Sequence, residues 1–151
     1  MPGKPIFPRD FSEFVESLNV NDVRYLVVGG YAVAFHGHPR YTKDLDIWIA
    51  RDAENAKRLV RALQDFGFGS IGFQIADFTE ADQIIQLGEP PLRIDLLTTV
   101  EGLDFEACYP SAKRVEIEGI QVTFIDLENL KKNKRAVGRA QDLADLENLR
   151  K

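Results

Sequence analysis

Two aspartates, Asp44 and Asp46, lie inside a segment that otherwise has the pattern of a buried strand. The segment 44–49 is DLDIWI, in which apolar residues alternate with Asp44, Asp46 and Trp48. Alternate residues of a strand point to the same side, so the two carboxylates are expected side by side, about 6.6 Å apart at Cα. Neighbouring carboxylates repel each other and lose solvation when they are partly buried. A divalent cation would relieve both costs, and carboxylate ligands favour Mg²⁺ or Mn²⁺ over zinc.

A third carboxylate, Asp95, is the one acidic residue of the predicted strand 92–99 (LRIDLLTT). Alternation places Asp95 on the same side as Arg93 and Leu97. If this strand lies beside 44–49, Asp95 completes a cluster of three carboxylates. Such a cluster can hold two metal ions and support an in-line phosphoryl displacement. We therefore predict Asp44, Asp46 and Asp95 to be metal ligands and catalytic residues.

A glycine pair, Gly29-Gly30, follows the apolar strand 24–28 and precedes a predicted helix. Glycine has no side chain, so backbone N–H groups at this junction can approach a phosphate closely. The start of a helix adds a favourable dipole. Arg40 and Lys43 stand just before the aspartates, and they are predicted to contact further phosphate oxygens.

The most basic local feature is the run 131–139, KKNKRAVGR. A charged helix face exposed to solvent is the default interpretation of such a run. The alternative is a site for a triphosphate or an RNA backbone, with Lys134 as the favoured residue. His36 and His38 are interpreted as helix-end or loop residues rather than metal ligands. Trp48, on the aspartate side, is interpreted as a packing residue, with base stacking as the alternative.

Length and charge limit the function classes. The chain of 151 residues has the size of one domain. Its net charge of −5 means that any contact with nucleic acid should be local. The single cysteine, Cys108, excludes an internal disulfide framework and suits a reducing compartment. The N-terminus lacks a signal-peptide pattern, and the longest charge-free run, 25–39, is too short to span a bilayer. We expect a cytoplasmic protein without a membrane partner.

The periodicity predicts one α/β (α+β) domain over 1–151, with a mixed β-sheet flanked by helices. Asp10 and Asp52 are predicted N-caps of two helices, the first within an N-terminal helix region 1–23. Strands are predicted at 83–87 and 92–99, and two more flank the turn at 118–119. Helices are predicted over 126–151, broken at Gly138, with the leucines of the last one in the core: Leu143, Leu146 and Leu149. The segment 67–91 holds no motif that indicates a function.

The glycine pair, the Asp-x-Asp and the later strand aspartate together resemble the nucleotidyltransferase superfamily. Within it, the chain is similar to a small bacterial group that includes the AbiEii-type toxins and related uncharacterised proteins. The shared features are the glycine pair, an Arg-x-Thr at Arg40 and Thr42, the Asp-x-Asp, and a closing segment, LKKNKRAVGRAQDLADLENL. The likeness spans 25–149, although the chain is shorter than the larger toxin enzymes of this group.

The resemblance implies a nucleotidyltransferase-like fold and an enzyme that uses Mg²⁺ or Mn²⁺. The enzyme would transfer a nucleoside monophosphate from a nucleoside triphosphate to a hydroxyl on RNA, including tRNA, or on protein. Asp44 and Asp46 would hold the metal ions, and Asp95 would bind the second ion and help to deprotonate the attacking hydroxyl. Gly29 and Gly30 would seat the phosphates, and Arg40, Thr42 and Lys43 would orient them. The resemblance also implies an antitoxin partner.

Three alternatives stay open from the residues alone. The aspartates could form ordinary ion pairs, Asp46 with Arg40 or Lys43 and Asp95 with Arg93, and the glycine pair could be only a tight turn. The same fold could serve as a non-catalytic module that binds a nucleotide or a partner, although three intact aspartates count against this. A phosphatase of the haloacid dehalogenase type also uses Asp-x-Asp, but IWIA follows here where that class has a Gly-Thr or similar.

Overall fold

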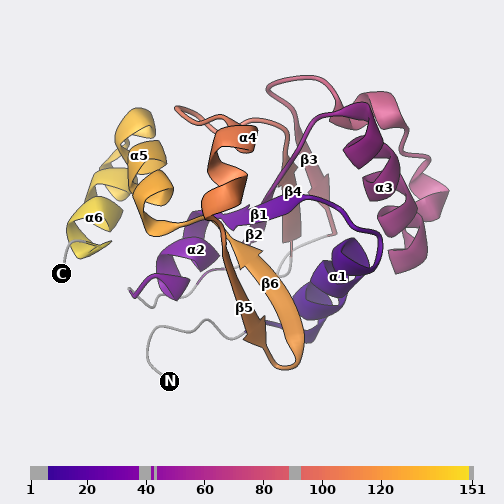
Figure 1. Cartoon of the computed structure of the whole chain (residues 1–151), viewed down its shortest axis with the longest axis horizontal. Helices are drawn as coiled ribbons and strands as arrows, with labels where there is room; N and C mark the ends of the chain where they lie inside the picture. Colours follow the sequence, from indigo (N-terminus) through magenta and orange to yellow (C-terminus); the bar gives the residue numbers. More distant parts are fainter. Residues whose placement is uncertain (1–6, 38–41, 43, 89–92, 150–151) are drawn as a thin grey trace.

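Figure 1 shows a computed structural model of the chain, which describes residues 7–37, 42, 44–88 and 93–149. In this part of the chain, six strands form one mixed sheet with helices on either side. The strands are β1 (Tyr25–Val28), β2 (Asp44–Ile49), β3 (Ile84–Leu87), β4 (Arg93–Leu97), β5 (Lys113–Ile117) and β6 (Ile120–Phe124). The predicted fold class, a mixed sheet flanked by helices, is confirmed.

The order of the strands across the sheet is β3-β4-β2-β1-β6-β5. The central strand β2 pairs antiparallel with β1 and parallel with β4, and β1 pairs parallel with β6. The outer pairs β3–β4 and β5–β6 are antiparallel hairpins, as predicted. The β5–β6 turn is formed by Glu118 and Gly119, both at positive φ (51° and 84°), which suits the twist of a two-residue hairpin.

The principal helices are α1 (Arg9–Val20), α2 (Gly29–Phe35), α3 (Ala53–Leu63), α4 (Phe105–Cys108), α5 (Leu127–Val137) and α6 (Ala140–Leu149). A π-helical turn at Gln64–Phe68 continues α3, and short 3-10 turns occur at Gly69–Ile71, Ile75–Phe78 and Tyr109–Ser111. In Figure 1, α1 and α3 lie together on one side of the sheet, and α5 and α6 form a pair at the opposite end of the molecule. No helix among the described residues is long and apolar enough to cross a membrane.

Local sequence signals explain most helix ends. The Asp52 side chain accepts a hydrogen bond from Asn55 N at 3.0 Å and so caps α3, as predicted. Gly138 ends α5 in the left-handed conformation, also as predicted. The prediction for Asp10 is wrong, because α1 begins at Arg9 and its N-cap is Pro8. Asp10 lies in the first turn of α1 instead, where its negative charge interacts favourably with the positive end of the helix dipole.

The core is built on the alternation of β2. Leu45, Ile47 and Ile49 are fully buried, which leaves the aspartates on the other side of the strand. The prediction for the last helix is wrong at one position: Leu146 and Leu149 are buried, but Leu143 is 55% exposed. Helix α6 makes its main contacts with α5 alone, so it buries a narrow apolar stripe that excludes Leu143.

Candidate active site

Asp46 and Asp95 lie directly opposite each other on the parallel strands β2 and β4. Paired residues on neighbouring strands point to the same side of a sheet, and neighbouring strands lie about 4.8 Å apart. Asp44 lies two residues before Asp46 on the same side. The structure therefore brings together the three carboxylates that the sequence singled out, from strands separated by almost 50 residues of chain.

Arg93 links two of these carboxylates. Its Nη2 lies 2.9 Å from Asp44 Oδ2, and its Nε lies 3.1 Å from Asp95 Oδ1. The alternative in which Asp95 pairs with Arg93 is thus realised, but the same guanidinium also reaches Asp44. A single cation shared by two of three carboxylates leaves the cluster with excess negative charge.

Asp46 shows the effect of that excess. Burial, followed by the charges of Asp95 and Asp44, raises the pKa of Asp46 from 3.8 to about 7, against the opposing charges of Arg93 and Lys134. Asp95 itself is 8% exposed. The negative charge of Asp46 is therefore unfavourable unless a further cation lies beside it.

Gly29 borders the cluster and adopts a backbone conformation that favours glycine. Its φ is +68°, and a Cβ placed on it would overlap Asp46 Oδ2 and come within 3.0 Å of Asp46 Cγ. The bare backbone of Gly29 thus lies against the Asp46 carboxylate, at the end of β1. Gly30 is buried in the first turn of α2. The glycine pair and the Asp-x-Asp are neighbours in space as well as in sequence.

The predicted phosphate-contacting residues have different outcomes. Thr42 lies beside the cluster, where its Oγ1 is 3.5 Å from Asp44 O and its own carbonyl accepts a hydrogen bond from Tyr31 Oη at 3.3 Å. Arg40 and Lys43 lie outside the described residues, as does His38. His36 is the C-cap of α2, and its Nε2 lies 2.7 Å from Ile125 O. This position agrees with the interpretation of His36 as a helix-end residue.

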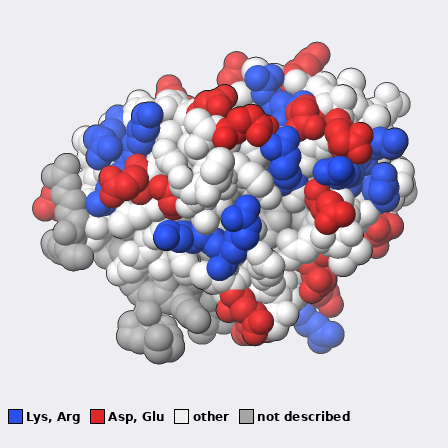
Figure 2. All heavy atoms as spheres, in the orientation of Figure 1, with Lys and Arg blue, Asp and Glu red and all other residues white. Residues whose placement is uncertain are grey.

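Lys134 is buried, unlike a residue of an ordinary solvated helix face. Its side chain is 7% exposed, and its Nζ lies 3.3 Å from Asp142 Oδ1 and 3.0 Å from Asp145 Oδ2. Arg139 Nε also contacts Asp142, at 2.7 Å. In Figure 2, basic side chains over the C-terminal helices lie next to acidic ones, and further basic side chains lie near the centre of the same face.

Asp142 and Asp145 were not among the predicted site residues. Both are 1% exposed, which is rare for carboxylates without a cation partner. Their signal in the sequence is the acidic pattern of GRAQDLADL, in which two aspartates three residues apart share one helix face. Together they hold the Lys134 ammonium in place.

The family model for nucleotidyl transferases of unknown function (DUF2204) matches residues 8–151. The chain belongs to this nucleotidyl transferase family. The match confirms the superfamily that the sequence resembled and extends over both the acidic cluster and the C-terminal helices. No curated protein is significantly similar to the chain.

Two solved structures have the same fold as this family member. A Thermotoga maritima protein assigned as a nucleotidyltransferase aligns with a TM-score of 0.63 and 16% identity, over 93% of this chain and 89% of that one. An antigenic nucleotidyltransferase-like protein from Paracoccidioides brasiliensis aligns with a TM-score of 0.52 and 20% identity, over 96% of this chain and 78% of that one. At these identities the likeness establishes the fold.

The donor set of the cluster suits a hard divalent ion. Among the described residues, no group of three or more His, Cys, Asp or Glu side chains is already arranged as a metal cage. Asp44 is instead engaged by Arg93. Asp46 and Asp95 nevertheless offer carboxylate oxygens from paired positions, and the raised pKa of Asp46 marks a site short of positive charge. These features fit Mg²⁺ or Mn²⁺, which prefer oxygen ligands.

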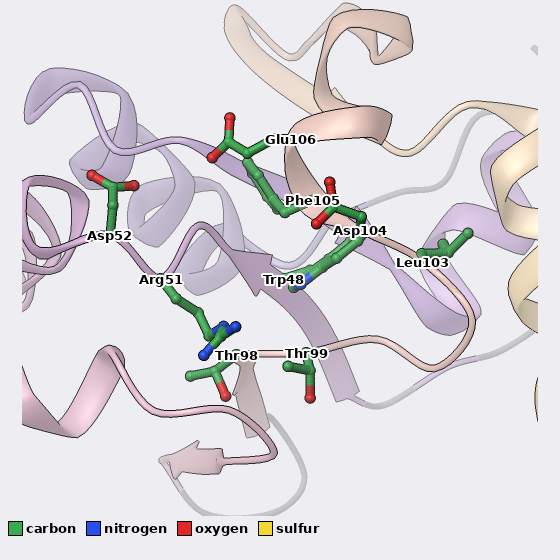
Figure 3. A pocket seen from close by; sticks show the side chains of 9 residues that line it. All are labelled: Trp48, Arg51, Asp52, Thr98, Thr99, Leu103, Asp104, Phe105 and Glu106. Carbon is green, nitrogen blue, oxygen red and sulfur yellow. The ribbon is translucent and has the colours of Figure 1, made fainter.

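A separate pocket lies where β2 and β4 end, beyond Trp48 (Figure 3). It encloses about 210 Å³ and is lined by Trp48, Arg51, Asp52, Thr98, Thr99, Leu103, Asp104, Phe105 and Glu106. Trp48 is 2% exposed and packs edge-to-face on Phe105 of α4, with ring centroids 5.1 Å apart. This burial agrees with the interpretation of Trp48 as a packing residue and leaves little ring surface for a stacked base.

Proposed function

We propose that this protein is a metal-dependent nucleotidyltransferase, which transfers a nucleoside monophosphate from a nucleoside triphosphate to a hydroxyl on RNA or protein. The observation that carries the proposal is the pairing of Asp46 with Asp95 beside the bare backbone of Gly29. Membership of a nucleotidyl transferase family supports the reaction class. The triphosphate substrate, the hydroxyl acceptor and the metal dependence are part of the proposal, and the carboxylates beside the bare glycine backbone support them.

Asp46 and Asp95, together with Asp44, would hold Mg²⁺ or Mn²⁺. When bound, the ion would neutralise phosphate charge and polarise the α-phosphate. The excess of three carboxylates over one arginine supports this assignment, because a divalent cation would offset the burial of the Asp46 charge and its repulsion by Asp95 and Asp44, which together raise the pKa of Asp46.

The remaining residues bind and orient the triphosphate. Gly29 leaves room for the Asp46 carboxylate, because a side chain there would overlap Asp46 Oδ2, and the bare backbone of the glycine pair would let its N–H groups approach phosphate oxygens. Lys134 supplies an ammonium whose direction is set by Asp142 and Asp145. Thr42 offers a hydroxyl next to Asp44, and Arg40 and Lys43 remain sequence predictions for the same role.

The transfer is a single in-line displacement. The acceptor oxygen forms a bond to the α-phosphorus while the bond from that phosphorus to the bridging oxygen breaks, and pyrophosphate leaves. The acceptor proton passes to Asp95, which lies next to Asp46 and is nearly buried. Arg93 positions Asp95 and Asp44 through its two contacts.

Label transfer from α-³²P nucleoside triphosphates tests the proposal. Each of the four triphosphates is incubated with Mg²⁺, cellular RNA and cellular protein, and pyrophosphate release is measured in parallel. We expect transfer by the wild type, loss of at least about 100-fold with Asp46→Asn, and no loss with the exposed control Asp10→Asn. Equal transfer by wild type and Asp46→Asn would reject the assigned site. Triphosphate binding without transfer to any acceptor would instead favour the non-catalytic binding module.

From the resemblance to AbiEii-type toxins, we also propose that the protein acts as a toxin. The transfer would inactivate an RNA or protein of the producing cell and would be restrained by an antitoxin. Growth arrest on expression of the wild type, absent with Asp46→Asn, would support this role. Unimpaired growth at equal expression would reject it.

A further inference from the structure

The sheet sets the direction from which an acceptor can reach the site. Across the sheet, the end of β1 with Gly29 comes first, then Asp46 on β2, then Asp95 on β4, and finally Gln86 on β3, which is paired with Asp95. In the proposed function, on which this inference rests, the triphosphate lies toward Gly29. An in-line displacement requires the attacking oxygen to enter opposite the leaving pyrophosphate. The acceptor should therefore approach over β3.

The surface over β3 is apolar beside Asp95. Ile84 is paired with Leu97 two residues along from the Gln86–Asp95 pair, so all four side chains point to the same side of the sheet. Ile84 is 63% exposed. A hollow of about 430 Å³ adjoins it, lined by Asp82, Gln83, Ile84, Leu97, Thr99, Val100 and Glu101. This hollow could receive an apolar side chain.

The charge of this region disfavours nucleic acid. The segment 80–106, which includes β3, β4 and the following loop, holds seven acidic residues and one basic residue, Arg93. Arg93 already contacts Asp44 and Asp95. The described residues that line the hollow include Asp82 and Glu101 but no lysine or arginine. An RNA backbone gains its affinity from basic contacts, and here it would meet carboxylates.

The strand itself offers a means of holding a polypeptide. β3 is the last strand of the described sheet on this side and pairs with β4 alone. An extended segment can add to such an edge through backbone hydrogen bonds, while alternate side chains enter neighbouring pockets. Apolar side chains would fit the hollow, and basic side chains would complement Asp82 and Glu101, which line it.

We propose that the acceptor is a protein, held as an extended, apolar-to-basic segment along β3, which presents a Ser, Thr or Tyr hydroxyl to Asp95. The hydroxyl oxygen forms a phosphodiester bond with the α-phosphorus, the bond to the bridging oxygen breaks, pyrophosphate leaves, and the hydroxyl proton passes to Asp95. The nucleoside monophosphate remains on the polypeptide.

Labelling followed by selective digestion distinguishes the acceptors. The purified full chain is incubated with Mg²⁺, α-³²P nucleoside triphosphates and an extract of cells that lack the protein, and the products are divided between nuclease and proteinase. We expect label that survives nuclease, disappears with proteinase and is absent with Asp46→Asn. Label confined to RNA would overturn the protein acceptor while leaving the proposed function intact. No label on either macromolecule would overturn both.

A substitution on β3 tests the docking surface. Ile84→Glu places a charge at an exposed position, and we expect labelling of protein to fall about tenfold or more. The matched control Val20→Glu makes a similar change on α1, at a residue that is 69% exposed, and should label like the wild type. Calorimetric titration with ATP and GTP in the presence of Mg²⁺ should give similar affinities for both variants. Undiminished protein labelling by Ile84→Glu, or loss of its triphosphate binding, would overturn the docking surface.

Discussion

The backbone of Gly29 lies against the carboxylate of Asp46, so close that a Cβ on the glycine would overlap Asp46 Oδ2. Gly29→Ala should therefore lower the free energy of unfolding by about 2–3 kcal/mol, through strain at φ +68° and through displacement of Asp46. Transfer activity should fall with it, because Asp46 would lose its position opposite Asp95. Urea denaturation and label transfer measure the two effects.

Comparison with Gly119→Ala separates the cost of backbone strain at positive φ from the cost of displacing the Asp46 carboxylate. Gly119 also has positive φ, +84°, but nothing lies within 4 Å of a Cβ placed there. This control should cost about 1 kcal/mol from the backbone alone and leave activity unchanged. Equal stability losses for the two alanine variants would show that Gly29 is needed only for its conformation.

Removing the charge of Asp46 should stabilise the protein when no divalent ion is present. Asp46→Asn relieves the cost of burying a charge and the repulsion from Asp95 and Asp44, so we expect the free energy of unfolding to rise by about 1 kcal/mol in EDTA. In millimolar Mg²⁺ the order should reverse, because binding to the folded state stabilises the wild type alone. Thermal melts of the wild type and Asp46→Asn, with and without Mg²⁺, measure the difference in stability under each condition. An equal response of wild type and variant to Mg²⁺ would contradict the metal assignment.

Much of the fold could be predicted because its signals are local. The alternation of 44–49 correctly gave the two sides of β2, and the turn at Glu118 and Gly119 correctly gave the β5–β6 hairpin. The caps at Asp52 and Gly138 were also predicted. The same local pattern wrongly predicted burial of Leu143. Burial of a residue on α6 depends on which part of that helix is covered by α5.

The site could be predicted only in part because its contacts cross the chain. Alternation predicted three acids on strands, but they come together only because β4 lies parallel beside β2, which no local pattern specifies. The contact of Arg93 with Asp44 spans 49 residues and follows from that register. The burial of Lys134 by Asp142 and Asp145 was missed because it depends on the turn at Gly138, which folds α6 back onto α5.

Lys134 should have two separable roles. Lys134→Met leaves two buried carboxylates without their ammonium, so we expect a loss of about 2–4 kcal/mol in the free energy of unfolding and a loss of triphosphate affinity. Adding Asp145→Asn should restore part of the stability but not the affinity. Lys132→Met, at an exposed position of the same helix, should change neither. Recovery of affinity in the double variant would show that Lys134 does not contact the nucleotide.

Asp142 should make stability depend on pH under acidic conditions. Burial alone would raise the pKa of Asp142, but the hydrogen bonds from Arg139 and Lys134 outweigh it and hold the pKa below its ordinary value of 3.8. A carboxyl whose pKa is lowered by folding contributes stability above its ordinary pKa, and that contribution is lost as the pH falls through the lowered value. Asp142→Asn should thus be less stable than the wild type by about 2–4 kcal/mol at neutral pH, and the gap should narrow below about pH 4. Urea denaturation from about pH 7 to pH 3 measures it, with Glu116→Gln on β5 as the exposed control. A gap that stays constant over this range would mean that the Asp142 carboxylate contributes through packing and not through its charge.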